Sequence, residues 1–244
     1  MAILYITTYL LSRDKRPRMY REFPCALCGA GCPGLICRGC YGDLPRLATA
    51  CNGCGLPLPS QTPACVACLV RPPCWERLVV PYTFAYPMDK VIHEFKYFGS
   101  VFWGAFLARE MARRGLATCT PLPEALVPVP AHPRRLADRG FNQAVELACG
   151  LGRELGIPVL TDKIVRVGSH PQQVGLTANQ RRMNVHGAFA TTGRGVVSGR
   201  VAIVDDILTT GATAKEMAKV LLRSGANQVQ VWVVARTPKA LRPR

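Results

Sequence analysis

The sequence contains no hydrophobic run long enough to cross a lipid bilayer, which takes about 20 consecutive apolar residues. The best candidate, MAILYITTYLLS at the N-terminus, is well short of this, and it lacks the basic segment and the small-residue cleavage site of a signal peptide. We therefore expect no membrane insertion and no export, and hence a cytoplasmic protein. Met19 is an alternative start, so residues 1–24 are interpreted as an extension of the folded chain.

The sequence also lacks the phosphate-binding pattern GxxxxGK[ST]. This absence argues against a P-loop nucleotide hydrolase. The apolar run that ends at Asp205 and Asp206 imitates a second motif of that class, so the two aspartates need another explanation.

Acidic residues are scarce, because 15 Asp and Glu stand against 31 Lys and Arg, which gives a formal net charge of +16. A charge of this size attracts polyanions such as nucleic acid, phosphorylated metabolites or acidic lipid surfaces, without choosing between them. The basic residues are spread along the chain, so no single arm carries the charge. Solubility alone is the competing explanation.

Cysteine is plentiful but confined, with ten of the twelve residues between Cys25 and Cys74. In a reducing compartment, such density indicates metal binding rather than disulfides. A CxxC pair lets both sulfurs reach one ion, and two pairs complete a closed tetrahedral Zn²⁺ shell. The eight candidate ligands are Cys25, Cys28, Cys37, Cys40, Cys51, Cys54, Cys65 and Cys68.

The spacing of the pairs favours two successive zinc ribbons with about two structural zinc ions in total, while an interleaved arrangement stays open. The segment RPPCWERLVVPY has the proline content of a joint. It predicts a double zinc ribbon at residues 25–76 and a second domain at residues 77–244. Loss of one ligand, as in Cys51→Ser, is expected to destabilise the ribbon and to spare the ligand pocket of the second domain.

In the second domain, helical and extended apolar patterns alternate. Strands are predicted at residues 158–160, 187–191, 201–204 and 229–235. The alternation predicts an α/β domain with a mainly parallel sheet flanked by helices.

The most informative segment is VAIVDDILTTGATA, residues 201–214. A buried strand ends at the two aspartates, and a helix follows in which Thr213 and Glu216 have the spacing of a capping box and Gly225 marks the end. A loop between the end of a parallel strand and the start of a helix is where open α/β sheets bind ligands.

Successive amides of this loop can wrap a phosphate, helped by the helix dipole. The adjacent carboxylates suit sugar hydroxyls and attract Mg²⁺, so a ribose 5-phosphate satisfies both halves of the pattern. If its C1 carries diphosphate, nearby negative charge stabilises an oxocarbenium-like transition state, which gives Asp205 and Asp206 a catalytic role. The predicted phosphate contacts are Thr209, Thr210, Gly211, Ala212 and Thr213.

VAIVDDILTTGAT resembles the phosphoribosyl diphosphate (PRPP) signature of type I phosphoribosyltransferases. Together with the Cys-rich start, VIHEFKYFG, LVPVPAHPRRLADRGFNQA and HPQQVGLTANQRRMNVHGAF, it is similar to the ComF family of competence-associated proteins over residues 25–237. The resemblance implies a double zinc ribbon followed by a phosphoribosyltransferase-like domain, in proteins that handle incoming single-stranded DNA during natural transformation.

The resemblance also extends PRPP contacts to other residues. PVPAHPRR stands in the place of the pyrophosphate loop, which implicates Ala131, His132 and Arg134. The segment Gly168 to Asn184 resembles the mobile loop that covers the site, and it offers Arg181 and Arg182 to the diphosphate. The plainer alternatives are a turn histidine before proline and a solvated pair of arginines on a helix.

Three functions stay open. The first is a protein that binds Mg-PRPP while handling incoming single-stranded DNA. The second is an active phosphoribosyltransferase whose acceptor the sequence does not identify, and the third is an adaptor whose zinc ribbons dock a DNA-processing protein. Turnover of PRPP separates the second from the others, and a steep fall of single-strand affinity with salt supports DNA contact.

Overall fold

The computed structural model describes residues 23–59, 62–98, 101–167, 187–192 and 197–238, and every structural statement concerns these residues. The chain forms two compact units, Met1–Asp43 and Leu44–Arg244. The second group of four cysteines therefore belongs to the same unit as the sheet, while the domain limits at residues 76 and 77 stay a prediction. Within the described part, no helix has the length and apolar character of a membrane span.

The smaller unit is organised by cysteines. Strand β1 (Phe23–Pro24) pairs antiparallel with β2 (Gly31–Cys32), and helix α2 (Arg38–Gly42) follows with Cys37 as its N-cap. Among its described residues only Cys25 and Cys32 are buried. Because so little apolar surface is buried, a bound ion is needed to hold these short elements together.

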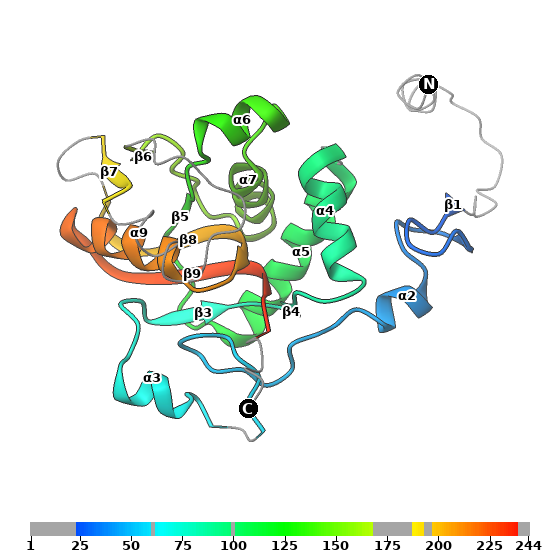
Figure 1. Cartoon of the computed structure of the whole chain (residues 1–244), viewed down its shortest axis with the longest axis horizontal. Coiled ribbons are helices and arrows are strands. Elements are labelled where there is room, and N and C mark those ends of the chain that lie inside the picture. The colour runs from blue at the N-terminus through cyan, green and yellow to red at the C-terminus, as the bar shows by residue number, and fades with distance from the viewer. Residues whose placement is uncertain (1–22, 60–61, 99–100, 168–186, 193–196, 239–244) are drawn as a thin grey trace, which may run out of the picture. The chain divides into compact units, whose positions relative to one another are not determined.

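The larger unit is built on a parallel sheet in the order β3-β9-β8-β5 (Figure 1). Every pairing in this sheet is parallel, including that of the short β4 with β9. Helices lie on both faces, so the central residues Val201, Ala202, Ile203 and Val204 have no exposed surface. The strands are β3 (Arg77–Val79), β4 (Tyr82–Thr83), β5 (Ala125–Pro128), β8 (Gly199–Leu208) and β9 (Ala226–Arg236).

The covering helices pack by their apolar faces. Met217 and Leu221 of α9 (Ala212–Arg223) join Val201 and Ile203 in one core cluster. Helices α4 (Met88–Phe98), α5 (Val101–Thr118) and α7 (Gln143–Leu155) complete the shell. The short helices α3 (Val66–Val70) and α6 (Pro133–Arg139) bury none of their residues. The predicted α/β class, with a mainly parallel sheet flanked by helices, is confirmed.

Several predicted boundaries are wrong. Strand β8 continues through both aspartates to Leu208, because it pairs with β9 along this length. Residues 158–160 form only an isolated bridge, between Leu126 and Val159. The strand predicted at 187–191 is β7 (Phe189–Thr191), which pairs with β6 (Ile164–Arg166) outside the main sheet. The segment RPPCWERLVVPY is interpreted from its sequence as a joint between domains, but its residues Arg77–Val79 form β3, an edge strand of the main sheet.

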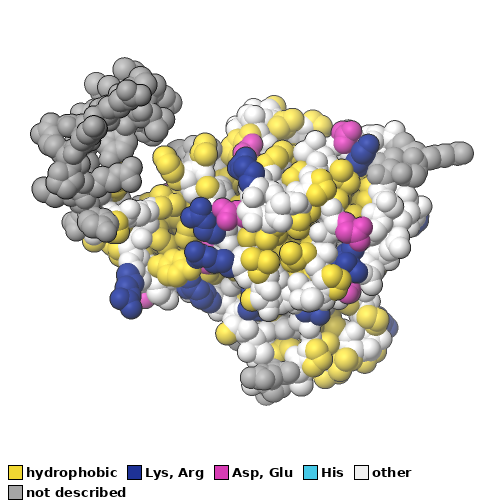
Figure 2. Space-filling view, turned by 180° about the vertical axis from the view of Figure 1, so that it is seen from behind, with side chains coloured by type: hydrophobic (Ala, Val, Ile, Leu, Met, Phe, Trp, Pro, Cys, Tyr) yellow, Lys and Arg dark blue, Asp and Glu magenta, His cyan; other side chains and the backbone are white. Residues whose placement is uncertain are grey.

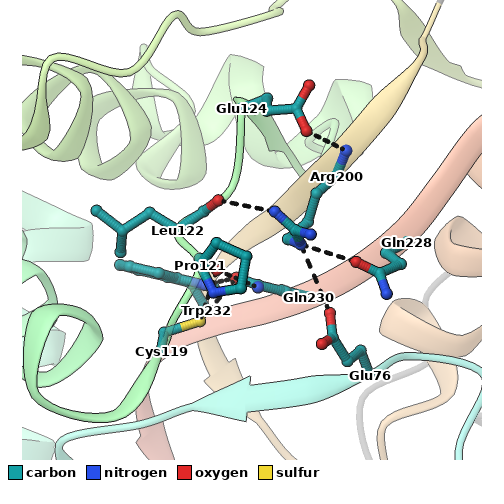
Figure 3. Close-up of polar contacts among 9 residues, drawn as sticks. All are labelled: Glu76, Cys119, Pro121, Leu122, Glu124, Arg200, Gln228, Gln230 and Trp232. Atoms are coloured by element: carbon teal, nitrogen blue, oxygen red, sulfur yellow. Dashed lines mark hydrogen bonds and ion pairs between the residues drawn. The ribbon is translucent and has the colours of Figure 1, made fainter.

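Polar side chains fasten the amino ends of the central strands (Figure 3). Arg200 of β8 donates from Nε to Gln228 of β9 at 2.8 Å, and its backbone N–H donates to Glu124 at 3.3 Å. Deeper in the sheet, Gln230 Oε1 accepts from the indole N–H of Trp232 at 3.0 Å and from the thiol of Cys119 at 3.1 Å. Open α/β sheets bind their ligands at the opposite, carboxyl end of the strands.

Candidate functional site

A hollow opens at the carboxyl end of β8, beside the start of α9. It holds about 340 Å³ of empty space, part of it open to solvent. The predicted residues Asp205, Thr209, Thr210, Gly211, Ala212 and Thr213 all line it, and the remaining lining is apolar: Val129, Ile203, Ile207, Leu208, Ala214, Val231 and Val233. The structure therefore brings one of the two aspartates and the whole predicted phosphate loop to one concave surface.

The loop reverses direction at Gly211, which is the N-cap of α9 and has a φ of 76°. Only glycine adopts this left-handed conformation without strain. The hydroxyl of Thr210 accepts the N–H of Ala212 at 3.4 Å. The predicted capping box is wrong, because Thr213 lies inside the helix and Glu216 pairs with Lys219 at 2.8 Å. The first N–H groups of α9 face the loop without helical partners, as at any helix start.

The two aspartates have different surroundings. Side chains alternate along a strand, so Asp205 lies on the same face of β8 as Ile203 and Ile207, which line the hollow. Asp206 lies on the opposite face and forms an ion pair with Lys96 of α4. The Asp206 Oδ2 to Lys96 Nζ distance is 2.6 Å, and the two side chains are only 15% and 18% exposed. Lys96 lies in the VIHEFKYFG motif, but its position far before Asp206 in the chain hides the contact from sequence reasoning.

The same surroundings change the charge of the site. Burial and the neighbouring charge of Asp206 raise the pKa of Asp205 to about 8, and its Oδ1 accepts the backbone N–H of Asp206 at 2.9 Å. Without a ligand, Asp205 therefore holds a proton at neutral pH.

The predicted pyrophosphate loop leads from Val129, at the edge of the hollow, into α6. His132 is 7% exposed and caps this helix, with Nδ1 accepting the N–H of Arg134 at 3.2 Å. Its Nε2 is buried and has no partner among the described residues. Ala131 is half-buried and Arg134 is exposed, while Arg181 and Arg182 lie outside the described residues.

Burial lowers the pKa of His132, and the charges of Arg166, Arg134 and Arg135 act in the same direction. The ring is therefore neutral at pH 7. Because Nδ1 accepts a hydrogen bond, the proton of the neutral ring is on Nε2. The buried Nε2–H is a donor that the described part of the protein leaves unused.

The eight predicted metal ligands form two separate groups, Cys25, Cys28, Cys37 and Cys40, and Cys51, Cys54, Cys65 and Cys68. The arrangement is therefore sequential and not interleaved. Sulfur atoms are 3.8 Å apart between Cys28 and Cys37 and 3.7 Å apart between Cys54 and Cys65. Four sulfurs placed about 2.3 Å from one ion in a tetrahedron are about 3.8 Å apart, so both groups fit a Zn²⁺ ion.

Backbone N–H groups prepare one sulfur of each group for a cation. Burial alone raises the pKa of Cys25, but hydrogen bonds from the N–H groups of Cys37, Cys28 and Leu27 outweigh it and lower the value to about 6. Cys51 is similar, because backbone donors outweigh burial and lower its pKa to about 7. Thiolates are the form in which cysteine binds zinc, so the backbone favours the metal-binding state.

These features define a class of protein: a parallel α/β domain with a ligand loop after a central strand and a four-cysteine metal site, preceded in sequence by a small unit with a second such site. No family model matches the chain. It is 38% identical over 178 residues to competence protein F of Haemophilus influenzae, a match that covers 69% of this chain and 76% of that protein. It is 39% identical over 176 residues to the DNA utilization protein YhgH of Salmonella typhi, covering 70% and 76%.

The chain belongs to this family of competence protein F and YhgH proteins, which confirms the resemblance to ComF. Among solved structures, a glutamine phosphoribosylpyrophosphate (PRPP) amidotransferase from B. subtilis has a TM-score of 0.38 and 21% sequence identity. That match covers 57% of this chain and 29% of that one.

Proposed function

We propose that the protein binds Mg²⁺-PRPP in the hollow and acts in the handling of incoming single-stranded DNA. The single observation that carries the first part is the hollow itself, where a backbone loop and the carboxyl group of Asp205 face one concave space. The second part is supported by relatives whose names refer to competence and DNA utilization.

The loop supplies the 5-phosphate contacts. Thr209, Thr210, Gly211 and the first turn of α9 line the hollow, so their amides are the candidate donors, and a helix start attracts negative charge. Hydroxyl groups of Thr209, Thr210 and Thr213 add donors that can turn toward phosphate oxygens. The described residues that line the hollow include no lysine or arginine, so neutral donors would hold the phosphate.

Asp205 supplies an acceptor for the ribose hydroxyls from within the hollow, and Asp206, which pairs with Lys96, remains a further candidate. Mg²⁺ binds through one or two carboxylates and the phosphates of its ligand, and Asp205 fits this use because it lines the hollow. When bound, Mg²⁺ would neutralise charge on the diphosphate. Lys96 holds Asp206 in place and offsets its negative charge.

His132 supplies a donor for the diphosphate end. Its Nε2–H is buried and unused by the described residues, and it follows shortly after Val129 at the edge of the hollow. A diphosphate oxygen would satisfy this donor, whereas a buried donor that stays unpaired costs free energy. Ala131, Arg134, Arg181 and Arg182 remain further candidates for this end of the ligand.

Calorimetry tests the proposal. Wild-type protein is titrated with PRPP, with ribose 5-phosphate and with diphosphate, each with and without Mg²⁺. PRPP with Mg²⁺ is expected to bind most tightly. The double variant Asp205→Asn, Asp206→Asn should lose this binding, whereas Glu154→Gln, which neutralises a carboxylate near the end of α7, should not. Equal affinity of the double variant would refute the assignment.

An assay for released pyrophosphate then separates two versions of the function. Release in the presence of candidate acceptors indicates a phosphoribosyltransferase. Tight binding without release indicates a protein that uses PRPP as a regulatory ligand.

A second candidate function is protein docking through the zinc-binding segments. Helix α3 follows the Cys65 ligand and exposes three aliphatic side chains, Val66, Leu69 and Val70, by 77%, 68% and 72%. Exposed aliphatic clusters of this kind are typical of interaction surfaces. The net positive charge does not mark a DNA-binding surface on the face in Figure 2, because Lys and Arg lie there among acidic and apolar side chains.

A further inference from the structure

The second group of four cysteines lies next to the ligand loop, and two side chains connect them. The connection involves Cys51–Gly55, which we call the second knuckle, and the loop residues Leu208–Gly211. Both segments belong to the larger compact unit. The two connecting residues are Arg236, at the end of β9, and Trp75, just before β3.

Arg236 holds carbonyl groups of both segments with one guanidinium group. Its Nε donates to the carbonyl of Cys54 at 2.7 Å. Its Nη1 donates to the carbonyls of Leu208 at 3.0 Å and Thr209 at 2.6 Å. The planar guanidinium fixes these donors relative to one another, so movement of the knuckle carbonyl is transmitted to the loop carbonyls.

These carbonyls determine where the loop amides point. A peptide group is planar, so the carbonyl of Leu208 and the N–H of Thr209 belong to one rigid plate, and the carbonyl of Thr209 and the N–H of Thr210 belong to the next. Arg236 therefore orients two of the N–H groups assigned to the phosphate. It does so from the side of the loop that carries the carbonyls.

Trp75 makes a second connection. Its indole N–H donates to the carbonyl of Gly53, inside the second knuckle, at 2.8 Å. Its ring lies against Gly211, where an added Cβ would be 3.3 Å from Cη2. Trp75 thus packs under the residue at which the loop turns into α9.

We propose that Arg236 and Trp75 are positioning residues that couple the second four-cysteine site to the ligand loop, so that metal occupancy at this site sets the affinity of the hollow. The proposal rests on the proposed function. Metal fixes the knuckle carbonyls, the two side chains fix the loop, and a fixed loop binds phosphate without a further ordering cost. By linkage, the ligand strengthens metal retention by the same factor.

Variants of the full-length chain test the coupling by zinc content and by the affinity for Mg²⁺-PRPP. Cys54→Ser should remove one zinc ion and weaken PRPP binding at least about tenfold, the effect of losing one hydrogen bond to a charged group. Cys40→Ser is the matched control. It removes zinc from the smaller compact unit and should leave PRPP affinity unchanged.

Arg236→Gln and Trp75→Phe test the connecting residues themselves. Both variants should keep two zinc ions, so that a loss of affinity reflects the connection and not the metal. Trp75→Phe removes the indole donor to Gly53 together with the ring atom Cη2 that lies against Gly211, so it breaks both contacts of this connection. Wild-type affinity in Cys54→Ser, or an equal loss in Cys40→Ser, would overturn the proposal.

Hydrogen exchange distinguishes failure of the coupling from failure of the proposed function. The amides of residues 209–211 should exchange faster in Cys54→Ser than in Cys40→Ser, with no ligand present. Faster exchange without any PRPP binding in the wild type would refute the ligand and keep the coupling. Equal exchange in the two variants would refute the coupling.

Discussion

Gly211→Ala is the sharpest single test of the ligand loop. Alanine at a φ of 76° adopts the left-handed conformation at a cost of about 1–2 kcal/mol. For a unit of this size, each kcal/mol lowers the unfolding temperature by about 2–4 °C. The strain alone therefore predicts a decrease of about 2–8 °C.

The substitution should also weaken the ligand, because the new Cβ lies 3.3 Å from the Trp75 ring. One of the two has to move by a few tenths of an ångström, and the Trp75 indole is held by its bond to Gly53. We therefore expect the loop to shift and to lose at least one amide contact to the phosphate. Loss of one such contact corresponds to about tenfold weaker binding.

Gly156→Ala is the matched control. Gly156 has a φ of 69°, ends α7, and has open space around the position of an added Cβ. Both variants should therefore lose similar stability in thermal unfolding, while only Gly211→Ala loses Mg²⁺-PRPP affinity by calorimetry. Equal PRPP affinity in the two variants, at equal loss of stability, would refute the role of the loop.

Three further predictions concern the acids, the histidine and the metal. Asp205→Asn should leave the unliganded protein as stable as wild type in thermal unfolding, because asparagine imitates the protonated carboxyl group. Calorimetry should nevertheless show loss of Mg²⁺-PRPP binding in this variant. Tight binding would contradict the role assigned to Asp205. His132 has a lowered pKa, so the unfolded chain takes up its proton first and the free energy of unfolding should fall as the pH drops below the ordinary value of 6.5. In His132→Asn the side-chain oxygen keeps the helix cap, so the free energy of unfolding measured with denaturant should depend less on pH than in the wild type. An unchanged pH dependence would exclude His132 as the source of this effect. Elemental analysis of untreated protein should give about two zinc ions per chain, and a chelator should abolish the structure of residues 23–43 as followed by their amide signals; metal-free protein with those signals intact would contradict the zinc assignment.

Local patterns account for what the sequence predicted well. Both groups of four cysteines and the loop that lines the hollow are made of residues close together in the chain, so their spacing carries the geometry. The parallel sheet follows from the alternation of strand and helix patterns. What sequence reasoning missed depends on contacts between distant segments, such as Lys96 with Asp206 or Arg236 with Cys54.

The wrong capping box shows how a local pattern can mislead. Thr213 and Glu216 have the right spacing, but a helix begins where the backbone turns, and Gly211 can turn at a positive φ with the Thr210 hydroxyl beside it. The expectation that loss of Cys51 spares the pocket also rests on a local pattern, and it stays a prediction. It treats the cysteines as a separate module, whereas Arg236 and Trp75 tie their backbone to the loop.

The long-range contacts also bear on the two aspartates beside the proposed phosphate loop. Judged from the sequence alone, these residues place two negative charges where the proposed ligand brings its phosphate. In the structure Asp206 is paired with Lys96, and the pKa of Asp205 is raised to about 8, so the unliganded hollow carries little net charge at neutral pH. Under the proposed function, a phosphorylated sugar would then approach the loop without strong repulsion, and a cation bound to it would displace the proton of Asp205. The proton held by Asp205 and the charge of Lys96 would thus let one site accept an anion and still offer the carboxylate of Asp205 to its hydroxyl groups and metal ion.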